Sequence, residues 1–281
     1  MDIRKGFPMS IKKHIPNAIT CCNLFCGVLA IVEASYQMFT QALLLLLLAA
    51  LFDFFDGFAA RVLKAYSPLG KELDSLADMV SFGVAPSIAG FFFIRSAAPF
   101  SVMRAEFFAH SSNPTLSVWV FLILSIIPFF IAVFSALRLA KFNNDTRQSE
   151  NFIGLATPAC AILYLSTIVL LTRYCNEQCG FFIAIRWQNW AMALFALLLS
   201  WLLVSNIPMF SMKLKNLSWA DNRIRFIYVA IVVVEAIMTA FAGLNFIVWI
   251  FASLATYILL NILIALSGKR LRLESLDANN Y

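Results

Sequence analysis

The stretch DFFDGFAARVLKAYSPLGKELDSLAD, residues 53–78, decides the fold that this chain is expected to adopt. It follows directly on ALLLLLLAALF, one of the most apolar runs in the chain, so four aspartates lie at or near the end of a hydrophobic segment. On insertion scales an aspartate at the centre of a membrane helix costs about 2.5–3.5 kcal/mol, and less near the interface. Four such side chains therefore need partners.

The composition around this stretch is typical of a membrane protein. The chain has 281 residues, of which 62% are hydrophobic and 13% are charged, against about 45–50% and about 25% in soluble domains. The apolar residues form long blocks, which predicts an all-α, polytopic transmembrane bundle because the backbone in lipid must bond within itself. At about 20 residues per crossing, eight spans are predicted: 15–36, 40–61, 74–95, 116–140, 156–173, 187–209, 226–243 and 245–267.

Lysine and arginine orient the predicted bundle, because cytoplasmic segments carry an excess of both. With the N-terminus inside, all but four of the 21 lysines and arginines fall in inner segments. The four in outer segments are Arg95, Arg104, Arg173 and Arg186. This bias predicts a multi-pass protein of the cytoplasmic membrane with both termini in the cytoplasm and residues 53–78 at the cytoplasmic face. The net charge of +6 follows this topology and does not indicate a nucleic-acid partner.

The spacing of the four aspartates predicts that they converge. Asp53 and Asp56 are three residues apart, and Asp74 and Asp78 are four apart, so each pair projects from one side of a helix. A turn at residues 66–70, which contain a proline and a glycine, makes the two helices antiparallel neighbours. Four facing carboxylates repel one another unless a cation is present. Oxygen ligands of this kind suit Mg²⁺ or Mn²⁺, and two ions can share four carboxylates.

The residues beside the aspartates indicate the ligand. Paired divalent ions clamp phosphate esters, and the basic side chains of Arg61, Lys64 and Lys71 can receive further phosphate charge. Gly57 and Ala60 share the face of Asp53 and leave room for a flat group or a close helix. The residues alone thus predict a membrane-embedded, divalent-metal site for a phosphate-containing ligand. The alternative is an ion-paired cytoplasmic loop.

The same stretch resembles the signature of the CDP-alcohol phosphatidyltransferase family, D-x2-D-G-x2-A-R-x8-G-x3-D-x3-D. Every fixed position and every spacer matches. The fixed positions are Asp53, Asp56, Gly57, Ala60, Arg61, Gly70, Asp74 and Asp78. Members of this family join a CDP-linked lipid to an alcohol and release CMP, so the resemblance implies a membrane enzyme of that class.

The resemblance also implies roles for individual residues. Asp53, Asp56 and Asp74 would be metal ligands, and Asp78 would share a metal and act as the catalytic base. The implied contacts of the nucleotide and its phosphates are Gly57, Ala60, Gly70, Arg61, Asn17 and Thr20. Two of these roles have alternatives, since Arg61 can instead brace the acidic cluster, and Asn17 and Thr20 can instead cap a helix.

Segments outside the signature resemble the bacterial and yeast-type members of the family that use serine. They are IPNAITCCNLFCGVLAI (15–31), DMVSFGVAPS (78–87), SALRLAKFN (135–143), FIGLATPACA (152–161) and SNIPMFSMK (205–213). One departure is Ala156, where those members usually have proline. The implied substrates are CDP-diacylglycerol and L-serine, in contact with membrane lipids. Candidates for binding serine or a phosphate are Arg138, Ser81, Asn143 and Lys64, with Arg138 equally able to be an interfacial anchor.

The family resemblance implies a division of the chain into parts and assembly as a homodimer, which is common among family members. The expected parts are an N-terminal arm (1–14), a six-span membrane core (15–215), two additional transmembrane helices (216–268) and a cytoplasmic tail (269–281). Three alternatives stay open at this point. They are a different acceptor such as glycerol 3-phosphate or inositol, a membrane prenyltransferase, and a cation transporter.

Overall fold

The computed structural model describes residues 9–96, 116–144, 152–175, 181–210 and 219–266, and they are almost entirely helical. The helices are α1 (Met9–Ser35), α2 (Phe39–Val62), α3 (Pro68–Asp78), α4 (Ala85–Ser96), α6 (Leu116–Ile126), α7 (Phe129–Asn144), α8 (Thr157–Leu170), α9 (Phe181–Val204), α10 (Trp219–Phe241) and α11 (Phe246–Leu266). Two π-helical segments, η1 (Met79–Val84) and η2 (Leu171–Cys175), extend α3 and α8. Two short strands, β1 (Phe152–Ile153) and β2 (Pro208–Met209), pair antiparallel.

Eight spans among the described residues are long and apolar enough to cross a membrane, which confirms the predicted all-α bundle. Several boundaries differ from the expectation, and the sixth span, predicted over 187–209, ends at Val204. The third span begins at Pro68 rather than at residue 74, because Ser67 caps the helix and Pro68 occupies its first turn. The fourth span is broken between α6 and α7, where Pro128 has no backbone N–H to donate. The predicted arm and tail, 1–14 and 269–281, lie mostly or wholly outside the described residues.

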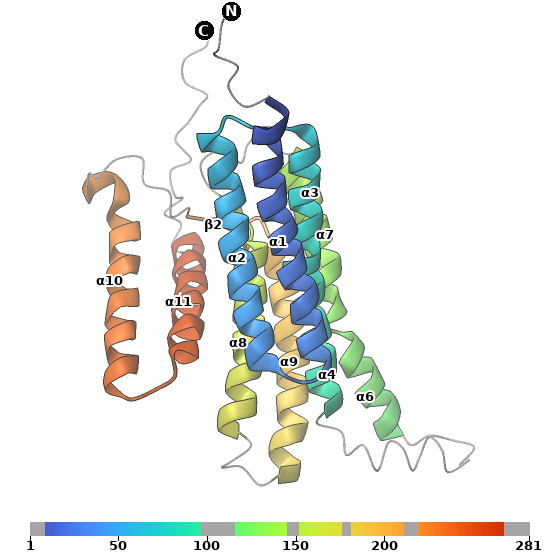
Figure 1. Ribbon diagram of the computed structural model, residues 1–281. Helices are drawn as coiled ribbons and strands as arrows, with labels where there is room; N and C mark the ends of the chain where they lie inside the picture. Colours follow the sequence, from blue (N-terminus) through green and yellow to red (C-terminus); the bar gives the residue numbers. More distant parts are fainter. Residues whose placement is uncertain (1–8, 97–115, 145–151, 176–180, 211–218, 267–281) are drawn as a thin grey trace, which may run out of the picture.

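The centre of the bundle is built from small residues on α1 and α2 that let the two helices run side by side. Ala30 and Ala34 of α1, and Ala42 and Ala49 of α2, are all buried. Helices in lipid associate through such close packing, because lipid offers no hydrophobic drive between them. Figure 1 shows α1 and α2 lengthwise in contact, with α3 and α4 beside α1 and with α8 and α9 behind. The packed pair α1 and α2 therefore supports residues 53–78, which carry the four aspartates.

The last two helices stand apart from this bundle. Figure 1 shows α10 and α11 as a hairpin beside α2 and α8. Of the two, α11 packs on α8 and buries Ile247 and Ile258, whereas α10 packs mainly on α11. Ala156 adopts an extended conformation before α8, and Pro158 lies in the first turn of that helix. The helix therefore starts regularly without the proline that related sequences usually have at residue 156.

Candidate metal and nucleotide site

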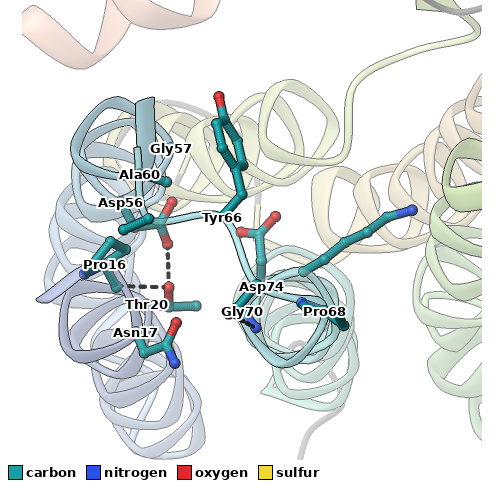
Figure 2. Close-up of a pocket in the computed structure, with 13 residues that line it drawn as sticks. Pro16, Asn17, Thr20, Asp56, Gly57, Ala60, Tyr66, Pro68, Gly70 and Asp74 are labelled. Atoms are coloured by element: carbon teal, nitrogen blue, oxygen red, sulfur yellow. Dashed lines mark hydrogen bonds between the residues drawn. The ribbon is translucent and has the colours of Figure 1, made fainter. Parts of the chain in front are cut away.

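Three of the four aspartates meet at the end of the bundle where α2 ends and α3 begins. Each of Asp53, Asp56 and Asp74 offers one carboxylate oxygen, and these oxygens all lie within 4.8 Å of one another. Asp56 is buried, and the other two are half-buried. Figure 2 shows the carboxylates of Asp56 and Asp74 facing a common space from two helices. The acidic faces predicted from the spacing therefore do come together.

A tight reversal of the chain brings α3 back against α2. Lys64 adopts a left-handed backbone conformation with φ of 49°, and the Ser67 side chain accepts a hydrogen bond from the Gly70 backbone N–H at 3.0 Å. The reversal is complete by Ser67, so Gly70 lies in the first turn of α3 and not in the connecting loop, as the sequence suggested. A Cβ atom at Gly70 would lie 2.9 Å from Asn17 Oδ1, so this glycine lets α3 approach α1 closely.

Thr20 of α1 holds one of the acidic ligands. Its hydroxyl oxygen lies 2.6 Å from Asp56 Oδ2 and 3.0 Å from the Pro16 carbonyl oxygen (Figure 2). Thr20 and Asp56 are both buried, so this hydrogen bond is shielded from water. The sequence suggested that Thr20 contacts the nucleotide or caps a helix. The structure adds a third role, which is to orient the Asp56 carboxylate, as hydrogen-bond partners of metal ligands commonly do.

Asp78 lies one helical turn beyond Asp74 and outside the group of three. Its Oδ1 atom accepts a hydrogen bond from Asn23 Nδ2 at 3.1 Å. The charges of Asp53, Asp56 and Asp74 still act on this carboxylate, so it belongs to the same acidic cluster. The sequence did not single out Asn23 as a partner of Asp78, because the two residues lie 55 positions apart.

A cavity of about 510 Å³ opens beside the three aspartates. Its lining includes most of the residues expected at the nucleotide, together with two of the acids and one lysine. They are Asn17, Thr20, Gly57, Ala60, Gly70, Asp56, Asp74 and Lys71. A Cβ atom at Gly57 would meet no protein atom within 4 Å, so the cavity extends over that residue. Arg61 and Lys64 are exposed and are not part of this lining.

The remaining candidates are Arg138 and Asn143 of α7, which packs against η1 and contacts α3, and Ser81 of η1 itself. Arg138 is buried, and its Nη1 atom lies 3.5 Å from the Thr157 hydroxyl oxygen, while its Nε atom has no hydrogen-bond partner. Asp78 immediately precedes η1, the segment against which α7 packs. Asn143 instead ties α7 to α3, because its Nδ2 atom donates to Ser75 Oγ at 2.8 Å.

Ser81 has a structural position. It is fully buried in η1, and its hydroxyl donates to the Asn23 carbonyl oxygen at 3.1 Å. Gly27 of α1 packs directly over it, since a Cβ atom there would lie 2.8 Å from the Ser81 Cα atom. Ser81 therefore joins η1 to α1 at the level of Asp78 rather than lining the cavity.

The acidic cluster fits a divalent cation. All its ligand atoms are carboxylate oxygens, which Mg²⁺ and Mn²⁺ prefer and which disfavour softer ions. In addition, one oxygen of Asp74 is buried and accepts no hydrogen bond. A buried carboxylate oxygen without a partner is costly, and a cation between the three side chains would provide one.

Comparison with known proteins relates this site to one family. The family model described as CDP-alcohol phosphatidyltransferase matches residues 13–202. Curated proteins named CDP-diacylglycerol–serine O-phosphatidyltransferase are similar to the chain. The Helicobacter pylori protein is 32% identical over 57% of this chain and 59% of its own length. The Bacillus subtilis protein is 38% identical over 52% and 70%, and the Saccharomyces cerevisiae protein is 34% identical over 57% and 55%. The match thus spans about three fifths of the Helicobacter relative.

Proposed function

The chain belongs to the CDP-alcohol phosphatidyltransferase family, and we propose that it transfers the phosphatidyl group of CDP-diacylglycerol to L-serine, giving phosphatidylserine and CMP. One observation carries the proposal, the group of three carboxylates beside a cavity lined by Asn17, Gly57, Ala60 and Gly70. The serine acceptor is supported by the relatives whose names state it.

In the proposed reaction the acidic cluster and the cavity bind the CDP part of the lipid. Asp53, Asp56 and Asp74 would hold one or two Mg²⁺ or Mn²⁺ ions, which neutralise the pyrophosphate and the departing CMP. Gly57 and Ala60 leave the wall of the cavity flat, so that the nucleotide can lie against α2. Arg61 and Lys64, both exposed at this end of α2, would meet the outer phosphate charge.

The chemical step is a direct attack of the serine hydroxyl on the phosphorus that carries the diacylglycerol. A new oxygen–phosphorus bond forms, the bond from that phosphorus to the bridging oxygen breaks, and CMP leaves with the bond's electron pair. Asp78 would take the hydroxyl proton as general base. Asn23 holds the Asp78 side chain for this task. Arg138, beside Asp78, would bind the carboxylate of serine, since a guanidinium pairs with carboxylates through two hydrogen bonds.

The setting of this reaction is also a proposal. The distribution of lysine and arginine supports the cytoplasmic membrane, with the site at the inner face and both termini in the cytoplasm. A six-span core over residues 15–215 and an added helix pair over 216–268 are supported by the family match, which ends before α10. A homodimer is expected from the family alone.

The test uses the purified full-length protein in detergent with CDP-diacylglycerol, labelled serine and Mn²⁺ or Mg²⁺. We expect CMP and labelled phosphatidylserine in equal amounts, and loss of both after the metal is removed with a chelator. If serine gives no product but glycerol 3-phosphate or inositol does, the acceptor is wrong and the reaction class holds. If no alcohol leads to release of CMP, the proposed activity is wrong.

A further inference from the structure

Two polar side chains on one face of α11 bind the segment that follows β2. Tyr257 and Asn261 are four residues apart and both contact Phe210, which directly follows β2. Asn261 Oδ1 accepts a hydrogen bond from the Phe210 backbone N–H at 2.9 Å, and the Tyr257 hydroxyl donates to the Phe210 carbonyl oxygen at 3.0 Å. We call these two hydrogen bonds the clasp. They satisfy both backbone polar groups of Phe210.

The clasp is buried and well fixed. Asn261 is 0% exposed, so its hydrogen bonds have no competition from solvent, and its Nδ2 atom donates to the Tyr257 carbonyl oxygen at 2.8 Å. The rings of Phe210 and Tyr257 are in edge contact, with centroids 5.0 Å apart, and Tyr228 of α10 packs edge-on against both. A buried asparagine in a membrane helix is costly unless its amide is paired. Here the amide oxygen is paired with the Phe210 backbone, and the amide nitrogen is paired with the backbone of α11 itself.

From Phe210 a short series of backbone hydrogen bonds leads to the start of α8. β2 pairs with β1, and the Gly154 N–H donates to the Ile207 carbonyl oxygen at 3.0 Å. The next residue, Leu155, donates to the Leu202 carbonyl oxygen at 3.0 Å. Gly154 has φ of 80°, and a Cβ atom there would lie 2.6 Å from the Leu203 carbonyl oxygen, so only glycine fits this turn.

The start of α8 is the surface against which Arg138 rests. Thr157 is the first residue of α8, and its hydroxyl oxygen lies 3.5 Å from Arg138 Nη1. Arg138 is 8% exposed, and its buried Nε atom is a donor without a hydrogen-bond partner among the described residues. Its position therefore depends on the segment that the clasp holds.

We propose that Tyr257 and Asn261 of α11 are positioning residues for Arg138. The clasp holds the segment after β2, and that segment in turn holds the start of α8, against which Arg138 lies. Arg138 is thereby kept in position to bind the acceptor alcohol. This inference rests on the proposed function and gives the added helix pair a role in it. Arg138 would bind a carboxylate group of the acceptor, because its guanidinium has a donor without a partner and pairs well with carboxylates. The cavity proposed for the CDP-lipid is lined by residues of α1, α2, α3 and the α2–α3 turn and includes neither clasp residue, so its binding is expected not to depend on the clasp.

The competing explanation is that the clasp only stabilises the packing of α10 and α11. The two roles differ in what they change. Loss of stability lowers the melting temperature and the amount of active protein, whereas loss of positioning raises the KM for serine selectively. A matched control exists in Thr256, whose hydroxyl donates to Glu235 Oε1 at 2.6 Å and so joins α10 to α11 without touching the clasp.

The experiment compares Tyr257→Phe, Asn261→Ala and the control Thr256→Val in the full-length protein, with KM measured for serine and for CDP-diacylglycerol. Loss of one buried hydrogen bond predicts a rise of about tenfold in the serine KM for either clasp variant. The CDP-diacylglycerol KM is expected to stay within about twofold of wild type. Thr256→Val is expected to leave both KM values unchanged, whatever its melting temperature.

Equal rises in both KM values, or the same serine effect in Thr256→Val, would overturn the inference and leave a structural role. Tyr257→Phe keeps the ring and removes only the hydroxyl, so it decides the matter if Asn261→Ala does not fold. An unchanged serine KM in both clasp variants also counts against the inference, and a wild type that accepts only an alcohol without a carboxylate overturns it together with the serine acceptor. A wild type inactive with every alcohol defeats the proposed function first.

Discussion

The two sides of the candidate site are built in different ways. The acidic side comes from residues 53–78, two helices joined by one tight turn, and its ligand atoms converge because helical periodicity places them on facing sides. The side around Arg138 is assembled from four separate elements. Its members are Arg138 of α7, Thr157 of α8, Phe210 after β2, and Tyr257 and Asn261 of α11.

This difference has a physical consequence for substitutions. On the acidic side most residues are proposed to contact metal or nucleotide directly, so a substitution there is expected to change chemistry or binding at once. On the Arg138 side most residues are proposed to hold another residue in place, so their loss is expected to change one kinetic constant by a modest factor. Asp78 lies between the two sides, since it is the last residue of α3 and the η1 segment that follows it packs against α7, the helix that carries Arg138.

The largest effect is therefore expected for Asp78→Asn, which keeps the shape of the side chain and removes the base. A positioned general base contributes about 10²–10⁴-fold, and we expect the turnover number to fall by about a thousandfold. CDP-diacylglycerol binding, measured by equilibrium binding with labelled lipid, should change little. A turnover near that of wild type would mean that another group takes the proton of the serine hydroxyl. Asp78 would then no longer connect the acidic side to the Arg138 side.

Asp53→Asn tests the acidic side alone. Replacing a carboxylate by an amide removes a charge from the group of three, so we expect the metal concentration for half-maximal activity to rise by about a hundredfold. The serine KM at saturating metal should stay unchanged, because Arg138 lies beyond Asp78. The measurement is a titration of Mn²⁺ against CMP release, with wild type in parallel. An unchanged metal requirement would count against Asp53 as a ligand.

Arg138→Lys tests the assembled side with the charge retained. Lysine lacks the planar fork that binds a carboxylate through two hydrogen bonds. Loss of one charge-assisted hydrogen bond, about 1.5–3 kcal/mol, predicts a rise in the serine KM of about tenfold or more. The CDP-diacylglycerol KM is the internal control. If both constants rise together, Arg138 contacts a phosphate of the lipid, and the two sides are not separate in function.

The same contrast explains what the sequence could predict. The convergence of Asp53, Asp56 and Asp74 follows from spacing within one helical hairpin, and the eight spans follow from apolar blocks of sufficient length. Both depend on local periodicity, which a single sequence contains. The small residues Gly57 and Ala60 could likewise be placed on the face that proves to line the cavity.

The contacts of Asn23, Thr20 and Asn261 could not be predicted in this way. Asn23 meets Asp78 across 55 positions, and Asn261 meets Phe210 across 51. Such pairs depend on how whole helices pack, and polar residues in a membrane helix are a weak signal of which partner they find. The one available sign was the cost of an unpaired asparagine in an apolar span, which predicts a partner without naming it.

The smallest effect concerns two glycines on the acidic side that differ in their surroundings. At Gly57 an added Cβ would meet no protein atom within 4 Å, whereas at Gly70 it would lie 2.9 Å from Asn17 Oδ1. Gly57→Ala is therefore expected to leave the melting temperature unchanged and to narrow only the cavity. A misplaced methyl group in a pocket costs about 1 kcal/mol at the low end, which predicts a rise of about fivefold in the CDP-diacylglycerol KM.

Gly70→Ala is the matched control, with the same added atom directed at protein instead of open space. Overpacking costs about 1–3 kcal/mol, so this variant should lower the melting temperature in detergent as α3 is pushed from α1. The CDP-diacylglycerol KM of this variant is then expected to rise because Asn17, a proposed nucleotide contact, is displaced. If Gly57→Ala lowers the melting temperature and leaves KM unchanged, the space over Gly57 is filled by protein in solution, and the nucleotide lies elsewhere than against this part of α2.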